Sequence, residues 1–206
     1  MMKKISIDNP FFEFMGKLGD IVLLNLLFLI SSLPVVTAGA SLSALYQSFD
    51  DMAGGEFISA FRNFPAAWKK NLKVSTKAWF LILLSGSLLV FDLTFVGGMN
   101  RGPGGQWGVI GIGIGCLLVI WEMVFCYIFP VILKGEKEMK NIVKRSFTLA
   151  VRNFQYTLPM IVMNSIPVIC FVLGGGLLVA AVPLYLVFGF GLTTFVNTFF
   201  LRRCIM

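Results

Sequence analysis

Histidine is absent from this 206-residue chain, and charged residues make up only 13% of it. The chain therefore lacks the commonest metal ligand and the usual general base near neutral pH. The four cysteines are widely spaced, unlike those of a zinc or redox motif, and lie at Cys116, Cys126, Cys170 and Cys204. We interpret them as small apolar residues, and we expect no enzyme activity, no bound metal and no cofactor.

Long apolar stretches dominate what is present, since 57% of the residues are hydrophobic. A helix that spans a bilayer needs about 20 consecutive, mostly apolar residues. Five stretches reach or approach that length, namely residues 18–33, 78–96, 107–133, 158–181 and 184–201. The sequence therefore predicts an all-α, polytopic transmembrane helix bundle that forms a single integral membrane domain over residues 1–206.

Basic residues outnumber acidic ones by 17 to 10, which gives a net charge of +7. Apart from Arg101 they lie near the two termini and in two connectors, 54–77 and 134–156. Cytoplasmic loops of membrane proteins are rich in lysine and arginine, so we expect these amphipathic connectors and both termini to be cytoplasmic at the cell membrane. Anionic lipid headgroups, and not nucleic acid, are the expected counter-charge. The candidate interfacial cations are Lys69, Lys70, Lys73, Arg145 and Arg152.

Residues 40–53 decide the number of passes, because their apolar residues recur at helical spacing while Asp50 and Asp51 are charged. If this segment crosses back, every basic residue except Arg101 falls on one side of the membrane. We therefore favour about six passes, the second one short, over five passes with the N-terminus outside. Acidic residues also interrupt the segment before the first span, so we expect a retained span and not a cleaved signal peptide.

Two similar aromatic-basic segments, 64–71 and 147–154, each precede a pair of predicted spans. With the N-terminal segment before the first pair, this pattern is consistent with three helical hairpins. Shared composition at membrane entry points explains the same similarity without an internal repeat.

Asp92 and Glu122 lie within apolar stretches, where ionisable groups are costly and often functional. At about 1.5 Å per residue they lie about 21 Å and 17 Å from the expected inner ends of two antiparallel helices. With Asn25 and Asn164 they form a candidate intramembrane polar site, interpreted as a proton relay or a cation site. The other interpretation is that neutral acids and amides only link helices by hydrogen bonds.

Glycines within residues 108–115 contain fragments of a dinucleotide-binding pattern, but no strand or acidic ribose partner accompanies them. Gly111 and Gly115 lie four residues apart on one helix face. This spacing predicts close helix packing.

Two blocks of residues resemble a known family. The first mixes turn residues, a carboxylate and aromatics: Asp8-Asn9-Pro10-Phe11-Phe12, Leu18-Gly19-Asp20, residues 33–41 and Ala44-Leu45-Tyr46. The second contains Tyr127-Ile128-Phe129-Pro130, Arg145, Ala150 and Arg152-Asn153-Phe154. In these blocks the chain resembles the YesL-like family of bacterial multi-pass membrane proteins. The resemblance implies a membrane protein of unassigned activity, often encoded near sugar-uptake transporters in Gram-positive bacteria.

Our functional expectation follows from the resemblance and from the absence of catalytic groups. We expect an accessory or regulatory component linked to carbohydrate uptake, with a sugar transporter or another membrane protein as its partner. The alternative is a small secondary transporter or channel that uses Asp92 and Glu122. An intramembrane enzyme is the least favoured class.

Overall fold

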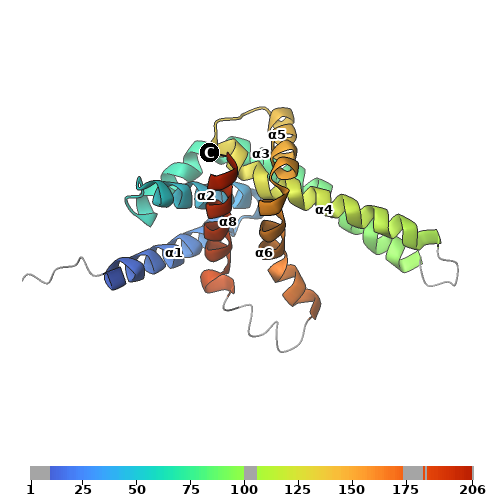
Figure 1. Cartoon of the computed structure of the whole chain (residues 1–206), viewed down its shortest axis with the longest axis horizontal. Helices are drawn as coiled ribbons and strands as arrows, with labels where there is room; N and C mark the ends of the chain where they lie inside the picture. Colours follow the sequence, from blue (N-terminus) through green and yellow to red (C-terminus); the bar gives the residue numbers. More distant parts are fainter. Residues whose placement is uncertain (1–9, 100–105, 174–182, 184, 206) are drawn as a thin grey trace, which may run out of the picture.

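The computed structural model describes residues 10–99, 106–173, 183 and 185–205 (Figure 1). Within these ranges the long elements are all helices, and no strand occurs. The helices are α1 (Pro10–Ser32), α2 (Ala38–Gly54), α3 (Ala60–Met99), α4 (Gln106–Leu133), α5 (Met139–Arg152), α6 (Phe154–Leu173) and α8 (Phe190–Ile205). Two short turns are η1 (Val35–Thr37) and η2 (Tyr185–Gly189), the second of them π-helical. The all-α prediction is confirmed for the described residues.

Four segments of the described chain are long and apolar enough to cross a membrane: Met15–Ser32, Ala60–Gly98, Val109–Leu133 and Tyr185–Cys204. They overlap four of the five predicted stretches, and they identify the chain as a candidate membrane protein. The remaining stretch, 158–181, begins in α6, and its residues after 173 lie outside the described ranges.

Helix α3 runs unbroken from Ala60 to Met99, so most of the expected connector 54–77 is helical and continuous with the next span. Gly55 ends α2 with a φ of 79°, a left-handed conformation that favours glycine. Asn63 then joins the two helices, because its Nδ2 donates to Asp51 Oδ2 at 3.0 Å. The second connector, 134–156, contains the amphipathic helix α5.

Helix α2 lies among α1, α3, α4 and α8 and forms much of the core. Gly39 permits its close approach to α3, since a Cβ at this position would lie 2.7 Å from the backbone oxygen of Ser75. Ser75 Oγ also donates to Ser43 Oγ at 2.9 Å in a fully buried contact. The predicted short second helix is therefore confirmed as a helix, whereas its crossing of the bilayer stays a prediction.

Helices α3 and α4 pack as an antiparallel hairpin that projects from the rest of the molecule in Figure 1. Gly86 on α3 makes room for the Trp121 indole, and Trp121 Nε1 donates to Ser85 Oγ at 2.9 Å. Gly111 faces Val96, as its predicted packing role requires. Gly115 makes no such contact among the described residues, because a Cβ there would meet nothing within 4 Å, so its packing role stays a prediction.

The hairpin carries large apolar side chains on its outer surface. Leu84 on α3 is 65% exposed, and Val109 and Ile112 on α4 are 73% and 70% exposed. Such a continuous apolar surface is unfavourable in water and is expected where lipid surrounds the helices.

The helices of each predicted hairpin contact each other, α1 with α2, α3 with α4, and α6 with α8, but the most extensive contact is between α2 and α3, which belong to different predicted hairpins. The two similar segments nevertheless differ in structure. Residues 64–71 lie inside the continuous helix α3, whereas residues 147–154 contain a break at Asn153 between α5 and α6. This difference favours shared composition over an internal repeat.

Candidate functional site

A cavity of about 350 Å³ lies between the central helix α2 and the helices around it. Aromatic rings form much of its wall. Among the described lining residues, Glu122 is the one with a carboxylate side chain. The lining residues are Phe28, Ala38, Leu42, Tyr46, Trp79, Trp121, Glu122, Phe125, Asn164, Pro167, Tyr185, Phe190, Thr193 and Thr194. This mixture of apolar walls and a few polar groups is typical of small-molecule sites.

Helical spacing places Trp121 and Phe125 on one face of α4, beside Glu122. Their rings stack with centroids 5.7 Å apart and an interplanar angle of 4°. Trp79 on α3 is fixed by a separate bond, because its Nε1 donates to the Val35 carbonyl oxygen at 2.8 Å. Hydrogen bonds and stacking therefore hold the aromatic wall in place before any ligand binds.

A chain of hydrogen-bonded polar side chains reaches the cavity wall at Asn164 and Tyr46. Asn164 Nδ2 donates to Cys126 Sγ at 3.3 Å, and Asn164 lines the cavity together with Glu122. Asn197 Nδ2 donates to Asn164 Oδ1 at 3.0 Å and to the Tyr46 hydroxyl at 3.4 Å. The buried Asn197 Oδ1 has no hydrogen-bond partner among the described groups. These contacts connect α2, α4, α6 and α8.

Asp92 does not join this site, contrary to the expectation that it approaches Glu122. The contacts of Gly86 with Trp121 and of Gly111 with Val96 place Asp92 at the level of Gly115, about 10 Å along α4 from Glu122. The side chain of Asp92 is exposed on the hairpin surface. The depth estimate failed because it matched Leu133 with Ala78, whereas this register sets Leu133 level with Val74, about one turn nearer the start of α3.

Asn25 is fully buried, but its side chain forms hydrogen bonds with backbone groups and does not line the cavity. Its Nδ2 donates to the carbonyl oxygens of Leu186 and, at 3.0 Å, of Val187. Its Oδ1 accepts a hydrogen bond from Gly191 N at 2.7 Å. A regular α-helix would pair the Val187 carbonyl with the Gly191 amide directly. The Asn25 amide therefore bridges a widened turn at the start of α8, as a side chain inserted into a helix does.

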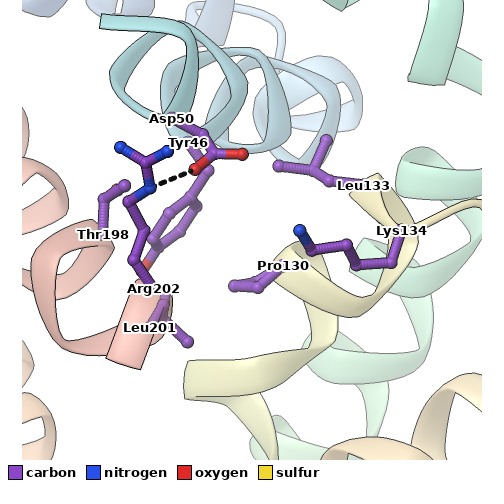
Figure 2. Close-up of a pocket in the computed structure, with 8 residues that line it drawn as sticks. All are labelled: Tyr46, Asp50, Pro130, Leu133, Lys134, Thr198, Leu201 and Arg202. Carbon is purple, nitrogen blue, oxygen red and sulfur yellow. Dashed lines mark ion pairs between the residues drawn. The ribbon is translucent and has the colours of Figure 1, made fainter. Parts of the chain in front are cut away.

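A second, much smaller pocket of about 30 Å³ is also lined by Tyr46 and lies near the ends of α2, α4 and α8 (Figure 2). Arg202 Nε lies 3.4 Å from Asp50 Oδ1 in an ion pair. Figure 2 shows the Lys134 side chain reaching into the same space from the end of α4. Tyr46 lines both pockets, so the aromatic cavity and this charged end share one side chain.

The five predicted interfacial cations are all exposed. Lys69, Lys70 and Lys73 lie on the first part of α3, and Arg145 and Arg152 lie on α5. Exposed aromatic residues accompany the cations of α5, with Phe147 on the helix and Phe154 just after it. Basic and aromatic side chains together are typical of a membrane interface.

Several cavity residues were not among the predicted site residues. Helical spacing could have identified Thr193 and Thr194 as site residues, because they lie one turn before Asn197 on α8 and share its face. The aromatic members carry no such signal, since Trp79, Trp121 and Tyr185 resemble ordinary residues of apolar spans. Among the predicted polar residues, the structure brings together Glu122 and Asn164, and leaves Asp92 and Asn25 elsewhere.

Comparison with known proteins gives one partial match. A family model described as "Protein of unknown function, DUF624" matches residues 21–93, about a third of the chain. The matched segment extends from within α1 through α2 and into the second half of α3, and it includes Tyr46 and Trp79 of the cavity wall. Searches of the curated proteins and of the solved structures give no match. The fold and the match together define a helical protein with four candidate membrane spans and a segment similar to this family.

Proposed function

We propose that the chain is a YesL-like protein of the cell membrane that binds a small solute and acts as an accessory or regulatory component of carbohydrate uptake. The aromatic cavity is the observation that carries the solute-binding part of this proposal. Its preformed wall and its few polar groups are suited to binding. The link to carbohydrate uptake and to a transporter partner comes from the family resemblance, with which the DUF624 match is consistent.

The proposed topology has six passes, formed by α1, α2, α3, α4, α6 and η2 with α8, and cytoplasmic termini. The convergence of Asp50, Lys134 and Arg202 supports it, because α2, α4 and α8 are the passes that end on one side in this topology. The exposed cations of α3 and α5 face anionic headgroups on that side.

Sugar uptake by cells tests the proposal. Thr194 is 4% exposed and lines the cavity, so Thr194→Trp fills it, while Leu84→Trp adds the same ring on the outer surface. We expect cells without the gene, and cells with Thr194→Trp, to take up labelled sugars more slowly at an unchanged amount of transporter. Leu84→Trp should restore the wild-type rate. Wild-type uptake of every sugar in cells without the gene would refute the proposal.

A small secondary transporter or channel is the second candidate, because Tyr46 lines both the cavity and the pocket at the charged end. Movement of this ring would connect the two spaces. Purified protein in liposomes should then move a solute in response to a proton gradient without any partner. Glu122→Gln should abolish that flux and Asp92→Asn should preserve it, since only Glu122 lines the cavity. Equal fluxes in the two variants would exclude this mechanism.

A further inference from the structure

We propose that the cavity takes a monovalent organic cation, namely an ammonium group carried on an apolar or ring-shaped body. This inference rests on the proposed function in one respect, that the cavity binds a solute. It adds the charge and the chemical class of that solute.

The charge of the wall is the first argument. Glu122 is the carboxylate of the cavity, and the described lining includes no lysine or arginine. The ion pairs of Arg202 with Asp50 and of Arg145 with Glu136 lie outside the cavity. A carboxylate removed from water without a counter-charge is unfavourable, so binding of a cation next to Glu122 offsets that cost.

The aromatic wall is the second argument. Trp79, Trp121, Phe125 and Tyr185 line the same cavity as the carboxylate, and the faces of aromatic rings attract ammonium groups. Calcium and magnesium require about six or more oxygen ligands, which a wall dominated by rings does not offer. The geometry therefore favours an organic ammonium ion over a metal ion.

The polar part of the wall is suited to the remainder of such a ligand. Thr193, Thr194 and Asn164 present hydroxyl and amide groups within one cavity. Its volume of about 350 Å³ is within the range of small-molecule sites and leaves room for a ring or a short polar chain beside the ammonium group.

Choline and its neutral carbon isostere, dimethylbutanol, form a matched pair of probes for the test. Binding to the full chain in detergent is followed by fluorescence, because Trp79 and Trp121 line the cavity. We expect choline to bind at least roughly ten-fold more tightly than the isostere, as loss of one charged contact predicts. A second pair, glucosamine and glucose, tests the same charge difference on a sugar ring.

Glu122→Gln keeps the size of the side chain and removes its charge, so choline affinity should fall by roughly ten-fold or more. Asp92→Asn removes an exposed carboxylate from the same hairpin and should leave affinity unchanged. Phe125→Leu should weaken choline binding, whereas Phe95→Leu on the outer surface should not. Melting temperatures confirm that each variant is folded.

Each outcome is decisive. Preference for the ammonium probes that depends on Glu122 supports the inference. Equal binding of charged and neutral probes, or full choline affinity in Glu122→Gln, overturns the cationic class but leaves solute binding in place. Binding of no probe at all overturns this inference and the solute-binding part of the proposed function together.

Discussion

Replacement of Asn25 by leucine removes an amide that serves three backbone groups at once. Asn25 Nδ2 donates to the carbonyls of Leu186 and Val187, and Oδ1 accepts from the Gly191 amide. Leucine has nearly the same size and no polar atoms. Asn25→Leu therefore leaves two carbonyls and one N–H without this partner where the fully buried Asn25 side chain joins α1 to η2 and α8.

The size of the effect follows from the number of groups left without a partner. At about 1 kcal/mol for each group, the loss is about 3 kcal/mol. A chain of this length loses about 2–4 °C in melting temperature for each kcal/mol, so we expect a decrease of roughly 6–12 °C. Interhelical hydrogen bonds in membranes are weaker on average, about 0.6 kcal/mol each. With this value for all three bonds, the variant loses about 2 kcal/mol of stability, which is the smallest effect that we expect.

Asn71→Leu is the matched control, because Asn71 is also buried but donates only to Ala67 within its own helix, at 3.3 Å. Thermal unfolding of purified protein in detergent measures both variants. Hydrogen exchange then localises the change, since the amide of Gly191 should exchange faster in Asn25→Leu alone. If the two variants melt at the same temperature, the Asn25 amide does not hold α1 to α8 as described.

Three further predictions concern helix packing and charge. Gly39→Ala should lower stability by about 1–3 kcal/mol in thermal unfolding, because its Cβ would clash with α3, whereas Gly16→Ala, with nothing within 4 Å, should not destabilise the chain. Tyr127→Phe removes a buried hydroxyl that bonds α6 at 2.9 Å and should cost about 1 kcal/mol, and an unchanged melting temperature would count against that contact. Arg202→Gln breaks a partly exposed ion pair and should cost less than about 1 kcal/mol at any salt concentration, so a larger loss would show that this pair is more than a surface contact.

Much of the fold follows from the sequence because lipid imposes a simple rule on helices. A run of apolar residues that is long enough to span the membrane is visible without tertiary information, and four such segments occur in the described structure. The start of α3 was less predictable. The basic residues of 60–77 suggested a connector, yet they lie on the exposed side of a helix whose other side buries Phe64 and Ala67 against α2.

The composition of the site depended on helix register, which the sequence does not contain. Glu122 was identified because a carboxylate in an apolar span is rare, and Asn164 was identified for a similar reason. Asp92 satisfied the same criterion, but the register of α3 against α4 places it about 10 Å along the helix axis from Glu122, and it lies on the exposed face of α3. Trp79 and Trp121 belong to the site because their side chains line the cavity. In the sequence they are ordinary residues of apolar spans, so nothing in it distinguishes them.

Accessibility of the cavity to a water-soluble cation tests the account most directly. Thr194→Cys places a thiol in the cavity wall, and Leu84→Cys places one on the outer surface of α3, at nearly the level of Glu122. In membranes, with the native cysteines replaced, we predict that a thiol reagent carrying an ammonium group modifies Thr194→Cys, that choline slows the reaction, and that Leu84→Cys does not react. Modification of Leu84→Cys alone, or no effect of choline on Thr194→Cys, would contradict an aromatic cavity that binds cations inside a membrane protein.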